Sequence, residues 1–542
     1  MPLKKLLPIF AFLFFARAGQ SQQYDRTWIW GAHPELQDSV LHYPGAGNEE
    51  GLFTDSFRYG PKHRGMAFEE SNCSFSDSSG HLLFQTNGMW VMDSSGHIIE
   101  NGDSLGYTDY YWEDLEEGAR AGIIGMELVY SFMALPQPGT DTGYYLFYPQ
   151  LYGDVTTPDF HPVYSYITRH RSTGHLKIEK KDIRLSIHQC EIGFLTACRH
   201  GNGRDWWVFF KEWKTNCYLR YLLTTDTLQF SGSQCIGEVE TEADYGKLVF
   251  SADGTKAVRG SETYHPQLFD FDRCSGLLSH PMVIDTFPEY DTLNLPFKAF
   301  CQSAEISSNN RFVYLNLMGL VYQYDLEAAD VMASRDTVLN TTKLKDTLSF
   351  PQPPNFDTLH YIYLPSYNFK CSQMAPDGRI FFATAMNGLG HSFTTIERPN
   401  EKGTAAMGTP KRYRTSKLVL YAPPHFPHYR TGRKIGSGCD TIYSGINSLY
   451  PLYGRAPALQ LQPNPNSGGS ELLISYNWIE WERYRQVQLV CYNSLGAVVL
   501  QLEVPAYSGF QQITLPNLQS GVYSLALEGD GKRIATSRLM ME

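Results

Sequence analysis

The strongest restriction on the fold comes from a strand–turn–strand pattern between Lys247 and Val258. Apolar residues lead into the polar turn Ser251-Ala252-Asp253-Gly254, and a second apolar run leads out. Asp-Gly between apolar runs favours a β-hairpin, because glycine adopts positive φ and aspartate bonds to its own backbone. The alternating aromatic stretch 268–272 follows and predicts an outer strand of the same sheet.

This pattern recurs along the chain. The equivalent residues before the polar turn are Phe75, Phe250, Ile306 and Met374. They are separated by 175, 56 and 68 residues. A period of about sixty residues fits these separations if two weaker copies lie between the first two residues. A β-unit repeated at this length is typical of the blades of a β-propeller.

The sequence therefore predicts an all-β protein with a six- or seven-bladed β-propeller over residues 24–445. Aromatic residues make up 14% of the chain and charged residues 19%, a balance that suits half-buried sheet surfaces. A length of 542 residues exceeds one ordinary core, so a second domain is expected.

The N-terminus has the pattern of an export signal. Lys4 and Lys5 precede the apolar run 6–15, and Ala16-Arg17-Ala18 supplies a small-residue cleavage site. We expect residues 1–18 to be a signal peptide, with a buried N-terminal helix as the alternative. No later stretch approaches the roughly 20 apolar residues of a transmembrane helix. A net charge of −11 disfavours nucleic acid as a partner.

The ten cysteines give no metal motif, because no C-x-x-C pair occurs among them. An exported chain can form disulfides. Cys190 with Cys198, or Cys217 with Cys235, could join neighbouring strands. Buried free thiols are an equal alternative, since cysteine also behaves as a small apolar residue.

The composition changes near residue 458. Five short strands with intervening turns are expected at 471–476, 486–492, 496–502, 511–515 and 522–527. Strands this short and this close together predict a small β-sandwich over residues 458–542, joined to the propeller by a linker at 446–457.

Three motifs of this C-terminal region carry a family resemblance. They are Gln462-Pro463-Asn464-Pro465, Cys491-Tyr492-Asn493-Ser494-Leu495-Gly496, and 515–523 with the sequence Leu-Pro-Asn-Leu-Gln-Ser-Gly-Val-Tyr. Their order and position resemble the type A C-terminal sorting domain of type IX secretion cargo. The resemblance implies sorting residues at Pro463, Asn464, Pro465, Gly496, Gly521 and Tyr523. It also implies recognition by the type IX machinery at the outer membrane of a Gram-negative cell.

A second resemblance concerns the first predicted blade. The stretch 76–88, followed by Met89-Trp90-Val91, is similar to the opening blade of exported WD40-like or YVTN-like propellers. This likeness covers about thirty residues and implies a secreted protein, free or attached to the cell surface.

Motifs for catalysis are missing from the sequence. It contains no G-x-S-x-G elbow, H-E-x-x-H helix, Walker loop or dinucleotide fingerprint, so no cofactor is expected. The densest acids, Glu113 and Asp114 beside Trp112, form a weak candidate ligand site or a solvated acidic loop. His425 and His428 could face a metal, but a third ligand is lacking nearby, so a plain loop is favoured.

Two functions from different classes fit these observations. The first is an exported binding or structural protein whose propeller presents a loop-lined face to a protein or glycan ligand. The alternative is a secreted propeller hydrolase or lyase acting on glycans or peptides, because a propeller fold supports many activities. Convergence of acids, histidines or a metal on the central channel would distinguish the second from the first.

Overall fold

The computed structural model describes residues 22–30, 39–42, 58–59, 66, 68, 71–106, 125–126, 128–152, 159–287, 303–317, 319–341, 346–349, 360–363, 368–385, 390–419, 423–440, 458–462, 466, 471–477, 487–503 and 509–541. Regular structure in these residues consists of β-strands and two short 3-10 helices. No helix among them is both long and apolar enough to cross a membrane. The all-β prediction is confirmed.

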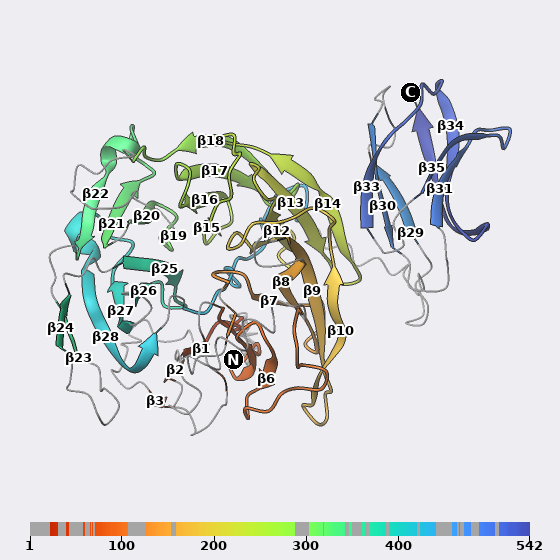
Figure 1. Ribbon diagram of the computed structural model, residues 1–542. Helices are drawn as coiled ribbons and strands as arrows, with labels where there is room; N and C mark the ends of the chain where they lie inside the picture. Colours follow the sequence, from red (N-terminus) through yellow and green to blue (C-terminus); the bar gives the residue numbers. More distant parts are fainter. Residues whose placement is uncertain are drawn as a thin grey trace, which may run out of the picture.

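Seven antiparallel sheets, here called blades 1 to 7, surround one axis (Figure 1). Blade 1 comprises β1 (Thr27–Trp30), β2 (Ser39–His42) and β3 (Arg58–Tyr59), and blade 2 comprises β4 (Cys73–Ser76), β5 (Leu82–Thr86) and β6 (Val91–Asp93). Blade 3 comprises β7 (Met133–Pro136), β8 (Gly143–Tyr152), β9 (Asp159–Arg169) and β10 (Leu176–Arg184). Blade 4 comprises β11 (Thr196–Arg199), β12 (Trp206–Lys211), β13 (Cys217–Leu223) and β14 (Leu228–Cys235).

The remaining three blades follow the same four-stranded order. Blade 5 comprises β15 (Gly246–Phe250), β16 (Lys256–Ser261), β17 (Gln267–Asp272) and β18 (Leu277–Val283). Blade 6 comprises β19 (Ser303–Ile306), β20 (Phe312–Leu317), β21 (Leu320–Asp325) and β22 (Asp336–Asn340). Blade 7 comprises β25 (Asn368–Met374), β26 (Ile380–Ala385), β27 (Gly390–Ile396) and β28 (Gly408–Val419). The hairpin of β23 (Asp346–Ser349) and β24 (His360–Tyr363) lies between blades 6 and 7 in sequence, and the 3-10 helices are η1 (Met332–Ser334) and η2 (Gly403–Ala406).

The predicted repeat matches the blades. Phe75, Phe250, Ile306 and Met374 all lie on the first strand of a blade, at β4, β15, β19 and β25. Blades 3 and 4 are the two copies that the spacing placed between Phe75 and Phe250. Their first turns, at 137–142 and 200–205, have no serine or alanine ahead of the aspartate or asparagine, so they do not match the pattern of the other copies.

One detail of the predicted blade was wrong. The aromatic stretch 268–272 was expected to form the outer strand, but β17 is the third strand and β18 pairs with it on the outside. The fourth strands β14, β18 and β22 include many half-buried or exposed residues. An edge strand of this kind has a weak apolar pattern, so it cannot be predicted from the sequence.

The polar turn of each hairpin is held by side-chain hydrogen bonds. Asp253 Oδ1 accepts from the Thr255 backbone N–H at 2.9 Å, and Ser251 Oγ accepts from the Lys256 N–H at 3.0 Å. In blade 6 Ser307 Oγ accepts in the same way from the Phe312 N–H at 2.8 Å. These bonds replace backbone partners that the turn leaves unpaired, so serine and aspartate or asparagine recur at these places.

The two ends of the propeller meet on its axis. Trp28 of β1 packs edge-on against Phe381 of β26 at a ring-centroid distance of 5.4 Å, which joins blade 1 to blade 7. Arg430 forms a two-pronged ion pair with Asp25, with nitrogen–oxygen distances of 2.5 and 2.8 Å. Residues 405 positions apart thus close the ring.

Two disulfides form within the described residues. Cys217 and Cys235 join β13 to β14, one of the two pairings that the sequence left open beside free thiols. Cys190 and Cys198, the other pair, are separate buried thiols. The second disulfide links Cys274 to Cys439 across 165 residues, a pairing that no local pattern could indicate.

The C-terminal region forms two further sheets, as expected for a small sandwich. One contains β29 (Ala458–Gln462), β30 (Glu471–Asn477) and β33 (Gly509–Thr514). The other has the order β32 (Val498–Glu503), β31 (Val487–Tyr492), β34 (Gly521–Gly529) and β35 (Lys532–Met541). The five predicted strands are all present, and β29 and β35 are additional. Buried apolar side chains such as Leu472, Leu489 and Leu525 form their common core.

Candidate functional site

The weak ligand-site candidates of the sequence lie outside the described residues. Trp112, Glu113 and Asp114 fall in 107–124, so their prediction stays untested. The described part of the chain contains no group of three His, Cys, Asp or Glu side chains that could hold a metal.

The axis of the propeller is occupied by residues 423–440, here called the axial segment. The His425 N–H donates to Asn72 O beside blade 2, and Gln373 Nε2 of blade 7 donates to Phe426 O. Tyr429 Oη donates to Ala134 O of blade 3 at 2.6 Å. The segment then runs past the hairpin turns of blades 4 and 5, where Cys439 bonds to Cys274.

A buried ion pair lies beside the axial segment, between the first strands of three blades. Lys247 Nζ on β15 contacts Glu305 Oε1 on β19 at 2.5 Å and donates to Ser372 O on β25 at 2.8 Å. Both charged side chains are 1% exposed. Lys247, in the hairpin of residues 247–258, therefore joins blades 5, 6 and 7, because its side chain on β15 lies against Glu305 of β19 and Ser372 of β25.

An aromatic residue and a histidine complete this cluster. The Lys247 ammonium lies 4.8 Å from the ring centre of Tyr130, whose hydroxyl donates to Ser372 O at 2.9 Å. The His425 ring lies 5.3 Å from Tyr130 and bonds through Nε2 to Leu195 O at 2.7 Å. Burial and the nearby lysine lower the pKa of His425 to about 3, so its ring is neutral at physiological pH.

Lysine, glutamate, tyrosine and histidine are residues that enzymes use, but their setting here is structural. The lysine and the glutamate neutralise one another, and the axial segment covers them. The contacts of this cluster therefore connect blades 5, 6 and 7 with the axial segment.

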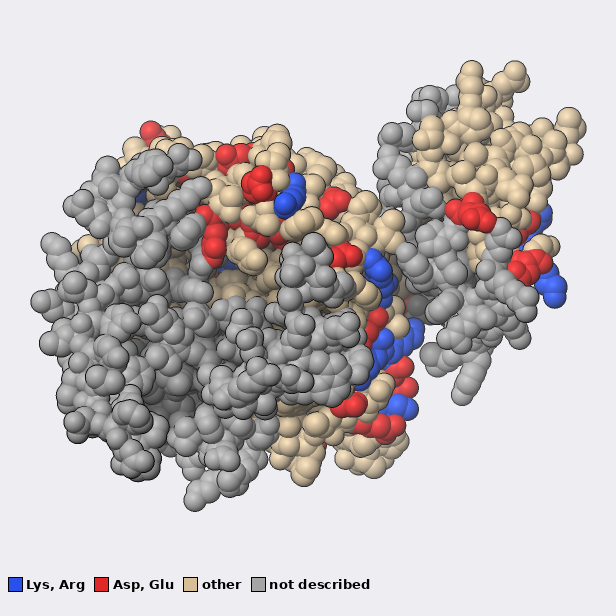
Figure 2. Space-filling model, in the orientation of Figure 1, with Lys and Arg blue, Asp and Glu red and all other residues tan. Residues whose placement is uncertain are grey.

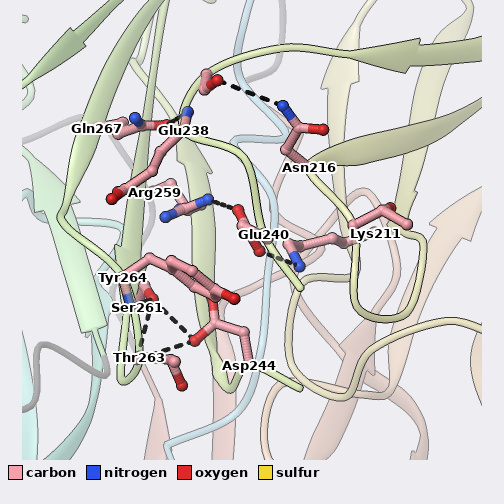
Figure 3. Close-up of polar contacts among 12 residues, drawn as sticks. Lys211, Asn216, Glu238, Glu240, Asp244, Arg259, Ser261, Thr263, Tyr264 and Gln267 are labelled. Atoms are coloured by element: carbon pink, nitrogen blue, oxygen red, sulfur yellow. Dashed lines mark hydrogen bonds and ion pairs between the residues drawn. The ribbon is translucent and has the colours of Figure 1, made fainter. Parts of the chain in front are cut away.

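A second buried network crosses the seam between blades 4 and 5 (Figure 3). Glu240, on the connection between these blades, pairs with Lys211 of β12 at 2.6 Å and with Arg259 of β16. All three side chains are 0% exposed. Asp244 accepts from Ser261 Oγ at 2.8 Å in the same seam. Because each blade supplies one cation to the shared carboxylate, the network aligns two sheets that have similar apolar faces.

Burial shifts the ionisation of this network. Desolvation raises the pKa of Glu191, which lies 3.8 Å from Lys211 Nζ, to about 7. Desolvation also lowers the pKa of Lys211 to about 8. Both shifts follow from removing charge from water, which favours the neutral form of each group. Because the charged groups of this seam pair with one another and their side chains are buried, we interpret this network as structural too.

The described residues line a pocket of about 500 Å³. It lies on the face that carries the turns between first and second strands, here called the turn face. The β7–β8 turn at 136–141 and the β11–β12 turn at 199–204 form its walls, and Gln22 and Tyr24 also line it. Three arginines and one aspartate line it, which gives a formal net charge of +2. The sequence did not indicate this pocket, because its walls come from turns of two different blades and from the N-terminal residues Gln22 and Tyr24.

The sandwich displays the predicted sorting residues only in part. Pro463, Asn464 and Pro465 lie outside the described residues. Gly496 ends the tight turn after β31 with a φ of +80°, a conformation that favours glycine. The Asn493 carboxamide holds that turn by accepting from the Ala497 N–H at 2.9 Å.

The other two predicted sorting residues begin β34. Gly521 also has a positive φ, at +156°. Tyr523 is half-buried against the sandwich core, and its hydroxyl donates to Gln519 O at 2.9 Å. Both residues thus shape the start of β34, although their part in sorting stays a prediction.

Comparison with protein families identifies the C-terminal region. Residues 460–542 match the family described as the secretion system C-terminal sorting domain. The match covers the sandwich described above. A comparison with curated protein sequences finds no match.

Solved structures similar to the chain include propellers of low sequence identity. The Dos1 propeller is 10% identical, with 73% of this chain and 83% of that chain covered and a TM-score of 0.37. The β-propeller domain of Cps50 (Swd1) from Myceliophteria thermophila is 9% identical, covering 58% and 86%, with a TM-score of 0.32. A gluconolactonase from Xanthomonas campestris is 11% identical, covering 67% and 86%, with a TM-score of 0.28. These likenesses carry no inference about function.

The sorting domain indicates where the protein is delivered. A tail of this family implies handling by the type IX secretion system, and hence secretion or attachment at the cell surface. The sheets that precede this domain form the β-propeller. The chain is an all-β protein in which a β-propeller is followed by a type IX secretion sorting domain.

Proposed function

We propose that the protein is an exported binding or structural protein, in which the propeller recognises a ligand and the sandwich directs export. In this proposal residues 1–18 are removed as a signal peptide and residues 24–445 form the propeller. Residues 446–457 form the linker to the sorting domain, which comprises residues 458–542. The match of residues 460–542 to the sorting family is the observation that carries it.

Recognition rather than catalysis is supported by the state of the axis. The axial segment and the Lys247–Glu305 pair fill the place where a propeller enzyme would gather its catalytic groups. Propeller loops and turns are held by rigid sheets, which suits them to binding. The turn face, with its pocket, is the surface that fits this role.

The sandwich offers its own surface to the export machinery. Leu495 and Val498 at the turn after β31 are 91% and 51% exposed, and Val522 and Met540 are 48% and 45% exposed. Val522 and Met540 pair across β34 and β35. These four residues, here called the apolar end of the sandwich, lie next to Gly496 and Gly521. In Figure 2 the described upper part of the sandwich shows few charged side chains. Exposed apolar side chains of this kind mark contact surfaces.

The proposal is tested by export from a host with a type IX secretion system. We expect the full chain in the medium or on the cell surface, and a chain lacking 458–542 in the periplasm. Release of the shortened chain at the full-length rate would overturn the sorting role.

A finer test addresses the apolar end. Leu495→Ser with Val522→Ser should lower surface delivery roughly tenfold, because each loses an apolar contact with the machinery. Val239→Ser is the matched control, since Val239 of the propeller is 76% exposed. Equal delivery of both variants would show that the apolar end takes no part in sorting.

A further inference from the structure

The pocket on the turn face contains a buried cation without a carboxylate partner. Arg199, at the end of β11, is 3% exposed and lines the pocket. Its guanidinium lies 3.9 Å from the ring centre of Trp206. Nη1 donates to Arg204 O at 2.8 Å, Nη2 to Gln22 Oε1 and to Tyr429 O, and Nε has no partner among the described residues.

This arrangement differs from that of other buried cations in the propeller. Lys211, Lys247 and Arg259 each contact a buried carboxylate. Arg273 also lacks a carboxylate, but its guanidinium donates to four backbone carbonyls and does not line the pocket. Arg199 alone among these cations combines an unpartnered N–H group with a place in the pocket wall. A buried charge gains most from an opposite charge, so the site favours an anion.

Gln22 shows where that anion would lie. Its neutral amide oxygen accepts from Arg199 Nη2, in the position where a carboxylate oxygen would form a stronger, charge-assisted bond. Gln22 is only half-buried, and it lines the pocket itself. A ligand carboxylate could therefore take the place of the glutamine side chain without displacing any strand.

The other charged side chains near the pocket do not change its preference for an anion, because they are paired with one another. Arg171 pairs with Asp141 at 2.8 Å, with both side chains 75% exposed. Arg204 pairs with Asp205 at 2.8 Å. Since each rim arginine has its own acid, the charge that remains for a ligand belongs to Arg199.

The rest of the wall indicates the body of the ligand. Tyr24, Pro136 and Pro138 present ring surfaces, and Thr140 adds a hydroxyl. Rings beside hydrogen-bonding groups suit a sugar, which has apolar faces and a polar edge. A volume of about 500 Å³ is within the range of small-ligand sites and accommodates a monosaccharide or disaccharide.

We propose that this pocket binds an acidic sugar of the uronic acid class, with Arg199 as the carboxylate-binding residue. The proposal deepens the proposed function, because it takes the propeller as the binding part of the exported protein. Gln22 acts as the internal cover of the site, which the ligand displaces.

Titration calorimetry of the purified full-length chain tests this proposal with D-glucuronate as the probe. D-glucose is the neutral comparison, and acetate tests the carboxylate alone. We expect glucuronate to bind roughly tenfold or more tightly than either, since only glucuronate supplies both charge and ring. Equal binding of glucuronate and glucose, or no binding of glucuronate, would overturn the proposal.

Three variants locate the binding. Arg199→Met should weaken glucuronate binding by roughly tenfold or more, through loss of the charge-assisted bonds. Gln22→Glu should weaken it similarly, because the new carboxylate pairs with Arg199 in place of the ligand, and it should raise the melting temperature. Arg533→Gln in the sandwich, a 55% exposed arginine, is the control and should leave binding unchanged.

The Gln22→Glu variant still tests the site if the Arg199→Met protein does not fold. A Gln22→Glu protein that is folded and binds glucuronate as the parent does would overturn the assigned position. Export of the Arg199→Met chain is measured in parallel. A chain that is delivered but does not bind separates failure of this inference from failure of the proposed function.

Discussion

The propeller and the sandwich have cores of different kinds. Propeller blades meet through apolar side chains and, in addition, through buried charges, with Lys247–Glu305 near the axis and Lys211–Glu240–Arg259 between blades 4 and 5. The described core of the sandwich is formed by apolar side chains. Buried ion pairs add little net stability compared with apolar packing, but losing one partner is costly. The difference indicates that charge helps to align blades 4 to 7 of the propeller, whereas the sandwich folds on apolar packing.

The largest expected effect is loss of one partner of the axial pair. Lys247→Met leaves Glu305 buried without its cation and should destabilise the propeller by about 3–5 kcal/mol. The measurement is denaturant unfolding followed by tryptophan fluorescence. Lys256→Met is the control, since its 2.6 Å pair with Asp270 is 37% and 42% exposed and should contribute less than about 1 kcal/mol. Equal effects of the two variants would contradict the account.

The same pair offers a sharper comparison. Replacing both partners, as Lys247→Met with Glu305→Met, should recover most of the stability, because no charge remains buried. Such a chain would have an apolar axis like the core of the sandwich. If its blades then assemble as cooperatively as those of the parent, charge is not needed to align them.

The next effect concerns the link between the axial segment and blade 5. Removing the Cys274–Cys439 disulfide with two serines should lower stability by about 2–4 kcal/mol, because it closes a loop across 165 residues. Removing Cys217–Cys235, which spans 18 residues, should cost less. Limited trypsin digestion should also cut faster at Arg433 and Lys434 in the first variant. Unchanged digestion there would show that the axial segment is held without its disulfide.

A pH effect should follow from His425. Its pKa in the folded protein, about 3, is below the usual value of 6.5, so the unfolded chain binds a proton first as pH falls. The stability that neutral His425 provides is therefore complete above about pH 6.5 and is lost towards pH 3. Between pH 7 and pH 5 the parent should lose about 2 kcal/mol more than His425→Gln. Parallel stability curves for the two proteins would mean that His425 is not buried as described.

The smallest effect should come from the sandwich. Tyr523→Phe removes one partly exposed hydrogen bond to Gln519 O and should cost about 0.5–1 kcal/mol in the unfolding of the sandwich alone. Near-normal stability with reduced export would separate a sorting role of Tyr523 from a packing role. Near-normal stability with normal export would remove Tyr523 from the predicted sorting residues.

The two regions also differ in what the sequence could predict. The sandwich has local hairpins and motifs with fixed order, so strands β30 to β34 and its family follow from short stretches. Blades 2, 5, 6 and 7, which have a polar turn at their first hairpin, could also be predicted from short stretches of sequence. Strand β35 was missed because its apolar and polar residues alternate weakly, with Arg538 and Lys532 among them.

The axis and the pocket could not be predicted in this way. The bonds of His425 to Leu195, Tyr429 to Ala134 and Cys439 to Cys274 span 230, 295 and 165 residues. Arg199 follows an ordinary apolar strand, and nothing near it in sequence distinguishes it from a surface arginine. Contacts of this range depend on the order of the blades around the ring, which a repeat period does not give.

The most direct test of the account is the intact mass of the protein recovered from the medium and the surface of its native host. The account predicts a chain that has lost residues 1–18 and whose C-terminal sandwich is either removed near residue 458 or retained in surface-attached material. A soluble periplasmic chain with residues 458–542 intact, and none in the medium or on the surface, would contradict the claim that the sandwich is an export address.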